Sequence, residues 1–254
     1  MTYTPMEMMI CAAARELEDG ATVAVGTGAP CAAAMLAQKT HAPRLLILFE
    51  AGGVAPQLKT MPISVGDSRT SHRALMATSM NDIMDACQRG AVDYAFLGGG
   101  QIDAYGNLNS TVIGDYENPK VRFPGSGGAN DFASFCWRTI VMTPHDPRRF
   151  VETVDFVTSP GYLTGPGARE AAGLPKGGGP YRVITDMAVM GFAEGSSWME
   201  LRSLHPGVDL DAVQARTGFV LEVMSPLGTT PAPEDDELRL LREEVDPDRL
   251  VIGR

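Results

Sequence analysis

The sequence is poor in cysteine and histidine, and none of these residues is spaced like a metal ligand. Its 254 residues include four cysteines and four histidines, widely separated along the chain. It contains no Cys-x-x-Cys pair and no His-Glu-x-x-His run, the local arrangements that hold zinc. We therefore expect no metal site, and reduced cysteines that pack as small apolar side chains.

An excess of basic residues is also missing. Lys and Arg number 21 against 31 Asp and Glu, which gives a net charge of −10. Nucleic acids and anionic membranes attract cationic surfaces, so this balance argues against both as partners. The longest apolar run, between Arg44 and Glu50, has five residues, whereas a membrane-spanning helix needs about 20. The composition is typical of a compact globular protein, which we expect to be cytoplasmic.

Helix and strand signals alternate along the N-terminal third. Thr4-Pro5-x-Glu7 is a helix start, with a capping threonine, a proline in the first turn and an acidic residue near the positive end of the helix dipole. A β-rich run at 21–25, an alanine-rich helical stretch at 30–38 and an apolar run at 44–49 follow. This alternation predicts an α/β fold with a largely parallel sheet. No linker or repeat interrupts the chain, so we expect one domain over 1–254.

The same pattern continues towards the C-terminus. We expect a hairpin of two strands at 181–185 and 187–192 that turns near Asp186. The other expected elements are helices at 80–90, 209–217 and 233–244 and strands at 92–97, 139–142 and 156–158. The chain has 28 glycines and 18 prolines, so tight turns should be frequent at strand ends, where open α/β sheets bind ligands.

Glu50 is the strongest single candidate for a catalytic residue. It ends the apolar run Leu45-Leu-Ile-Leu-Phe49 and precedes Ala51-Gly52-Gly53. A carboxylate at the C-terminal end of a buried strand, beside glycines that let a ligand approach the backbone, lies where an open α/β fold places its chemistry. The alternative is a glutamate that merely ends the strand and faces solvent.

Two glycine-rich segments are candidate binding loops. Gly125-Ser-Gly-Gly-Ala-Asn130 leaves backbone N–H groups unshielded, and such groups stabilise an oxyanion or hold a phosphate. The second segment starts with Gly98-Gly-Gly100 and continues with the side-chain amides of Gln101, Asn107 and Asn109. These amides either orient a polar ligand or form turns within the loop, and the residues alone leave both interpretations open.

Several common nucleotide and hydrolase motifs are missing. Gly26-Thr-Gly28 follows a predicted strand, but position 31 is a cysteine where a dinucleotide-binding fingerprint has its third glycine. The chain also lacks a Gly-x-x-x-x-Gly-Lys-Ser/Thr phosphate loop and a Gly-x-Ser-x-Gly nucleophile elbow. These absences argue against nicotinamide binding, a phosphate-loop nucleotidase and an α/β-hydrolase.

Taken in order, these segments resemble the β subunits of family I CoA-transferases, particularly their glutaconate branch, over nearly the whole chain. No single motif is decisive, but the ordered set is specific. The stretches that carry the resemblance are Ser64-Val-Gly-Asp67, Gly99-Gly-Gln-Ile-Asp-Ala-Tyr-Gly-Asn107, Ile113-Gly-Asp-Tyr116, Pro119-Lys-Val-Arg-Phe-Pro-Gly-Ser-Gly-Gly-Ala-Asn130, Thr158-Ser-Pro-Gly161 and Gly165-Pro-Gly167.

The resemblance implies a three-layer open sheet of the family I CoA-transferase type and a set of site residues. In that family a glutamate between an apolar strand and a small residue with glycine is the nucleophile, and Glu50 in Phe49-Glu-Ala-Gly52 matches it. The other implied residues are oxyanion or CoA contacts at Gly127, Gly128, Ala129 and Asn130 and a substrate loop at Gly52, Gly99, Gly100 and Gln101.

The implied activity moves CoA from an acyl-CoA to a carboxylic acid through a glutamyl-CoA thioester on Glu50. Coenzyme A is then a substrate, no cofactor is permanently bound, and the acyl groups are of the glutaconate, other dicarboxylate or 3-oxo acid type. The family pairs its β subunit with an α subunit, so we expect a heteromer. Two alternatives remain: an acyl-CoA hydrolase or decarboxylase on the same fold, and a non-catalytic ligand-binding subunit.

Overall fold

The computed structural model describes residues 2–253, which divide into two compact units. Of the described residues, unit 1 comprises 2–96 and 231–253, and unit 2 comprises Leu97–Thr230. The C-terminal segment therefore returns to the unit that the N-terminal segment begins. The assignment of one functional domain over 1–254 stays a prediction. No helix within the described residues is long and apolar enough to span a membrane.

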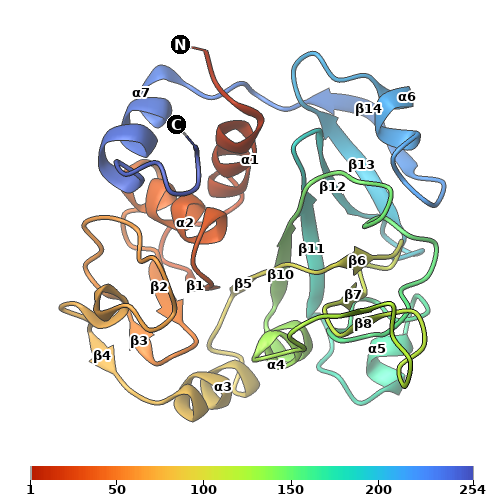
Figure 1. The fold of residues 1–254 in the computed structure, drawn as a ribbon, viewed down its shortest axis with the longest axis horizontal. Helices are drawn as coiled ribbons and strands as arrows, with labels where there is room; N and C mark the ends of the chain where they lie inside the picture. Colours follow the sequence, from red (N-terminus) through yellow and green to blue (C-terminus); the bar gives the residue numbers. More distant parts are fainter. Residues whose placement is uncertain (1, 254) are drawn as a thin grey trace. The chain divides into compact units, whose positions relative to one another are not determined.

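Unit 1 contains a small sheet and a group of helices (Figure 1). Its strands are β1 (Thr22–Val25), β2 (Leu46–Phe49), β3 (Gly53–Val54), β4 (Met76–Ala77) and β5 (Tyr94–Leu97), which reaches the boundary of the unit. Its helical segments are α1 (Pro5–Ala14), α2 (Ala29–Lys39), η1 (Ser68–Ser71), α3 (Met80–Gln88), α7 (Asp235–Leu240) and η2 (Leu241–Val245).

The three central strands of unit 1 run parallel. β1 lies between β2 and β5, and Val23 is opposite both Ile47 and Tyr94. All three residues are buried, as expected for strands covered on both faces. β3 and β4 continue the sheet beyond β2 in antiparallel pairing. Because β1, β2 and β5 are parallel, their C-terminal ends lie at one edge, and this edge is where α/β sheets bind ligands.

The helices of unit 1 follow the local signals closely. Thr4 accepts a hydrogen bond from the Glu7 N–H and Glu7 accepts one from the Thr4 N–H, which confirms the predicted N-cap as a full capping box. The buried carboxylate of Glu7 also pairs with Arg242, with Oε1 2.6 Å from Nε. Figure 1 shows α1, α2 and α7 grouped together. α1 ends at Ala14.

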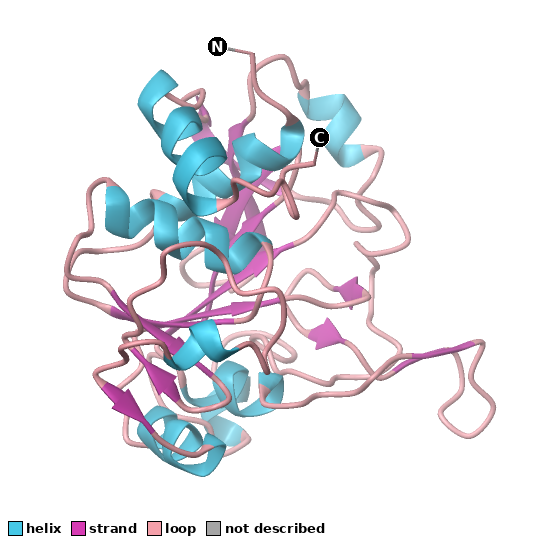
Figure 2. Cartoon of the chain, turned by 60° about the vertical axis from the view of Figure 1, so that its left-hand side comes forward, coloured by secondary structure: helices cyan, strands magenta, loops and turns pink. Residues whose placement is uncertain are grey.

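Unit 2 is built mostly of strands and loops. Figure 2 shows the helices, strands and loops of the whole chain in separate colours. Its strands are β6 (Gln101–Ile102), β7 (Leu108–Asn109), β8 (Val112–Ile113), β9 (Val121–Arg122), β10 (Arg138–Met142), β11 (Gly179–Ile184), β12 (Ala188–Phe192), β13 (Met199–Leu204) and β14 (Glu222–Thr229). Its helices are α4 (Ala129–Phe135), α5 (Ala168–Ala171) and α6 (Leu210–Gln214).

Five strands of unit 2 lie side by side in the order β14-β13-β12-β11-β10. β11 and β12 pair in antiparallel fashion, with Val183 opposite Met190, which confirms the predicted hairpin. β10 pairs with β11, and β13 with β14, in parallel. The predicted strand at 156–158 is wrong. That segment is a bend in which Phe156 is exposed and stacks on Tyr116, because its side chains face a neighbouring loop and not a sheet.

Two of the four histidines, His145 and His205, are buried in the core of unit 2. His145 is buried, with Nδ1 3.2 Å from Thr185 Oγ1 and Nε2 3.0 Å from Thr217 Oγ1. Its ring stacks on Phe150 at a centroid distance of 4.2 Å. Burial disfavours the charged ring and lowers the pKa of His145 from 6.5 to about 4.

This histidine predicts an acid-sensitive core. Folded His145 binds fewer protons than unfolded His145 between these two pKa values, so its stabilisation is present above pH 6.5 and is lost as the pH falls towards 4. We expect wild-type protein to lose about 2 kcal/mol more between pH 7 and pH 4.5 than His145→Gln, as measured by urea unfolding at each pH. An equal loss in both proteins would contradict the assignment, since the acidic groups are common to both.

Candidate active site

Glu50 directly follows β2 at the edge where the parallel strands of unit 1 end. The Gly52 N–H donates to the Phe49 carbonyl over 2.9 Å, so the chain turns sharply as soon as the strand is complete. Glu50 lies in this turn and is half-buried. The three strands therefore hold a carboxylate on a short, constrained turn at the edge of the sheet where open α/β folds bind their ligands.

The glycines after Glu50 are required by the protein backbone. A Cβ on Gly52 would lie 1.9 Å from the Thr78 carbonyl oxygen, and a Cβ on Gly53 would lie 1.8 Å from that of Thr70. The φ angle of Gly52 is also +111°, which L side chains rarely adopt. The space that we assigned to a ligand near Gly52 thus contains another segment of unit 1, and contact of Gly52 with substrate stays a prediction.

The predicted oxyanion loop forms a tight turn before α4. The Ala129 N–H donates to Ser126 O over 3.0 Å, and Gly127, with φ +50°, is the second residue of that turn. The Asn130 N–H donates to Ser126 Oγ, and its side-chain amide donates to Thr158 O. The amides of Ala129 and Asn130 therefore shape the loop, whereas Gly127 lies at its tip.

The side-chain amides of the 98–109 loop form hydrogen bonds with each other and with nearby aspartates. Gln101 Oε1 accepts from Asn109 Nδ2 over 2.7 Å and from the Asp155 N–H over 3.0 Å. Asn107 Nδ2 donates to Asp103 over 2.8 Å. Apart from that of Asp155, all of these side chains are buried. Of the two interpretations left open by the sequence, the structure favours turn formation, and substrate contact by Gln101 stays a prediction.

A pocket of about 730 Å³ opens beside this loop within unit 2. Gly99 and Gly100 form part of its wall, and the Phe123 ring lies directly over Gly100, where a Cβ would be 2.5 Å from the ring. The remaining lining residues are Gly98, Gln101, Ser110, Ile113, Val121, Pro124, Asp146, Arg148 and Arg149. The structure thus brings three of the predicted substrate-loop residues, Gly99, Gly100 and Gln101, to one cavity.

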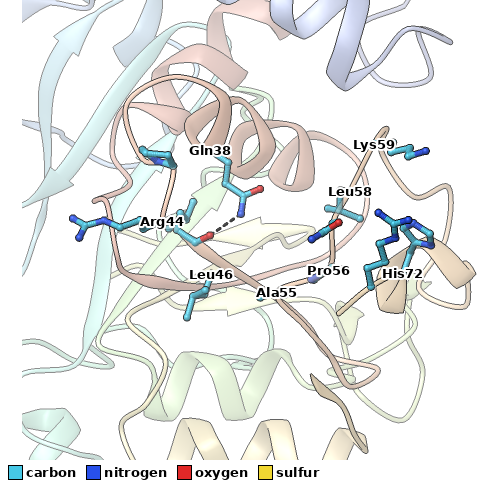
Figure 3. A pocket seen from close by; sticks show the side chains of 12 residues that line it. Gln38, Arg44, Leu46, Ala55, Pro56, Leu58, Lys59 and His72 are labelled. Carbon is cyan, nitrogen blue, oxygen red and sulfur yellow. Dashed lines mark hydrogen bonds between the residues drawn. The ribbon is translucent and has the colours of Figure 1, made fainter. Parts of the chain in front are cut away.

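A second pocket, of about 440 Å³, lies in unit 1 (Figure 3). Gln38 donates to the Leu45 carbonyl at its base over 2.6 Å, and Lys59 and His72 flank it. Its strand residue Leu46 is the first of β2, whereas Glu50 follows the last. Four residues of extended strand separate them, roughly 13 Å, so this pocket opens at the opposite end of the strand from Glu50.

Sequence reasoning missed Arg169, which organises the loops of unit 2. Its buried guanidinium donates to the carbonyls of Gly161 and Pro160 and to those of Ala133 and Ser134 in α4. It thereby links α4, the helix that follows the predicted oxyanion loop, to the segment at 160–161. The sequence signal for this role was an arginine within the segment 158–170, which is rich in proline and glycine. The carbonyl groups of such loops need side-chain hydrogen-bond donors.

The described residues form no cluster of side chains that could bind a metal ion. Within residues 2–253, no three His, Cys, Asp or Glu side chains are grouped so that they could hold an ion. The four cysteines are buried and form no disulfide with one another. Burial raises the pKa of Cys11 and of Cys31 to about 12, so both are neutral thiols at pH 7.

Comparisons with known proteins agree with this architecture. The family model described as Coenzyme A transferase matches residues 6–216. The chain is 40% identical to the B subunit of glutaconate CoA-transferase from Acidaminococcus fermentans, over 98% of this chain and 95% of that protein. It is 39% identical to the B subunit of 3-oxoadipate CoA-transferase from Pseudomonas knackmussii, over 94% and 92%.

The fold matches as well. The crystal structure of glutaconate coenzyme A-transferase from Acidaminococcus fermentans superposes with a TM-score of 0.94 at 38% identity, covering 100% of this chain and 98% of that one. The predicted α/β fold class of the CoA-transferase type is therefore confirmed, as is the predicted resemblance. The chain belongs to the coenzyme A transferase family and is of its β-subunit type.

Proposed function

We propose that Glu50 is the nucleophile through which this chain transfers CoA from an acyl-CoA to a carboxylic acid. The observation that carries the proposal is a half-buried glutamate on the turn that ends a buried parallel strand. A carboxylate oxygen is itself a nucleophile, so it attacks a thioester without a general base. Coenzyme A is a substrate in this scheme, and Glu50 carries each covalent intermediate.

The reaction balances without another reagent. A Glu50 oxygen attacks the acyl-CoA carbonyl, the tetrahedral intermediate expels CoA thiolate, and an acyl-glutamyl anhydride remains. The thiolate attacks the Glu50 carbonyl of the anhydride, which forms the Glu50–CoA thioester and releases the first acid. The carboxylate of the second acid attacks this thioester, and the same steps in reverse regenerate Glu50 and release the new acyl-CoA.

The oxyanion of each tetrahedral intermediate needs hydrogen-bond donors. We assign this task to the loop Gly127–Asn130, with the Gly127 N–H at the tip of the turn as the leading donor. Ser126 accepts from the amides of Ala129 and Asn130 and so keeps the turn in shape, which makes these two supporting residues. One lost donor of this kind costs about 3–4 kcal/mol of transition-state stabilisation.

The partner is an α subunit of a CoA-transferase. Both relatives above carry the letter B in their names, which implies a second kind of chain in each enzyme. We therefore assign the active form to a heteromer in which this chain supplies the nucleophile. The acyl groups are dicarboxylic or 3-oxo acids, since glutaconate and 3-oxoadipate are both dicarboxylates and the second is also a 3-oxo acid.

Intact mass of the chain, co-purified with its α subunit, tests the proposal. Incubation with glutaryl-CoA and no acceptor should add one CoA to this chain, with the adduct on the peptide that contains Glu50. Addition of a carboxylic acid should remove the adduct and yield a new acyl-CoA. Free CoA that accumulates without an adduct would indicate a hydrolase instead. An acyl-CoA that binds and stays intact would indicate a non-catalytic role.

A further inference from the structure

The pocket of about 730 Å³ in unit 2 is lined by both apolar and charged residues. The apolar residues, called the apolar wall below, are Ile113, Val121, Phe123 and Pro124. The charged residues are Arg148, Arg149 and Asp146. A concave site with an apolar wall and a few polar groups is typical of small-molecule binding, and this one suits a short hydrocarbon chain that bears an anionic group.

Arg149 is held in a fixed position at the glycine-rich wall. One terminal nitrogen of its guanidinium donates to the Gly99 carbonyl over 2.8 Å. Its backbone N–H donates to Asp146 O over 2.8 Å, and its carbonyl accepts from the Ile102 N–H over 2.7 Å. The side chain is half-buried, so its orientation is set by packing as well as by these bonds.

The remaining side-chain donors of Arg149 form no hydrogen bond with the described residues of the chain. Nε and the second terminal nitrogen donate to no acceptor in residues 2–253. The acidic residue in the same pocket, Asp146, is bound by Arg148, which approaches it with Nε at 3.0 Å and a terminal nitrogen at 2.8 Å. The hydrogen bonds and charge of Arg148, and to a smaller extent the charge of Arg149, hold the pKa of Asp146 well below its usual range, so Asp146 stays charged and hydrogen-bonded to Arg148.

We propose that Arg149 binds an oxyanion group of the substrate in this pocket, while the apolar wall packs against the adjoining hydrocarbon. The inference rests on the proposed CoA transfer and deepens it, because it names the residue that selects the substrate. The oxyanion belongs either to a second carboxylate on the acyl group or to a phosphate of CoA. Arginine presents its donors in a planar fork that matches both groups.

Substitution of Arg149 in the complex with the α subunit tests this inference. The acceptors are glutarate and valerate, which share a five-carbon chain and differ in the second carboxylate. If Arg149 binds that carboxylate, Arg149→Gln raises KM for glutarate about 10- to 100-fold and leaves KM for valerate within about twofold. Arg149→Lys keeps the charge but loses the fork, so its KM for glutarate should lie between those of wild type and Arg149→Gln.

If the oxyanion bound by Arg149 is a phosphate of CoA, the KM values change in a different way. In that case Arg149→Gln raises KM for the acyl-CoA donor and leaves both acids unchanged, and donors built on 3′-dephospho-CoA show whether the 3′-phosphate is the group bound. An unchanged KM for donor and acceptors, or an equal rise for all of them, overturns the inference. If Arg149→Gln does not fold, the same comparison with Arg149→Lys decides the question.

Two controls separate this inference from the proposed function. Arg89→Gln removes an exposed arginine that pairs with Asp85 at the end of α3, and all its kinetic constants should match wild type. Arg149→Gln should still form the CoA adduct on Glu50 when the donor is saturating. Absence of an adduct in wild type itself means that the proposed function fails, whereas an adduct without altered acid selectivity or donor KM means that only the Arg149 assignment fails.

Discussion

Glu50→Gln should abolish CoA transfer by the complex, with a loss on the order of 10⁴-fold or more in kcat. An amide is neutral and lacks the nucleophilic carboxylate oxygen, so neither the anhydride nor the thioester can form, and only binding and oxyanion contributions remain. Steady-state transfer between acyl-CoA and acid measures the loss. Intact mass should show no CoA adduct on the variant, while thermal unfolding should match that of wild type.

Glu50→Asp is the matched variant, because it keeps the charge and withdraws the carboxylate by one methylene. A displacement of about 1 Å costs on the order of 10²-fold in rate, so this variant should be slow but should still form the adduct. Full turnover in Glu50→Gln would rule out the nucleophile assignment. Equal activity in the two variants would assign Glu50 a structural role instead.

Gly52→Ala should have the largest effect on stability among substitutions near the site. Its Cβ would lie 1.9 Å from the Thr78 carbonyl oxygen, and the φ of +111° would be strained for alanine. Backbone strain and forced displacement together predict a loss of about 4 kcal/mol or more in the free energy of unfolding. Chemical denaturation of the chain measures this, and the paired Thr78 segment should lose hydrogen-exchange protection.

Gly20→Ala separates the cost of a positive φ from the cost of the close contact with Thr78. Gly20 also has a positive φ, +82°, but a Cβ there would have no atom within 4 Å. We expect a loss of about 1 kcal/mol from this variant, since only the backbone conformation is unfavourable. If Gly52→Ala is no more destabilised than Gly20→Ala, the close approach of Thr78 does not contribute.

The sequence predicted the parallel core of unit 1 because its signals are local. The Thr4 cap sets the start of α1, and the apolar run at 44–49 places β2 one residue before Glu50. β14 was missed, because most of its residues are exposed and show no alternation that would predict a strand. The segment at 156–158 was assigned to a strand on its β-branched residues, although its contacts are to loops.

The roles of the loop residues depend on contacts between distant positions. Gln101 lies 54 residues from Asp155, and the bond between them makes its amide part of the loop framework. Arg149 lies 50 residues from Gly99, and this contact directs its guanidinium along the pocket wall. Neither contact is marked by a periodic pattern in the sequence, so local sequence analysis does not predict it.

For this protein, the sequence by itself determined the N-cap of α1, the buried parallel strands and the position of Glu50 at a strand end. These features follow from hydrophobic periodicity and backbone preference, which act over a few neighbouring residues. Only the tertiary structure decided why position 52 is a glycine and which side-chain amides are hydrogen-bonded within the loop. It also decided that Arg149 keeps guanidinium donors that bond to no described residue. Each of these depends on which remote backbone or side chain occupies the adjacent space, and only the folded chain specifies that.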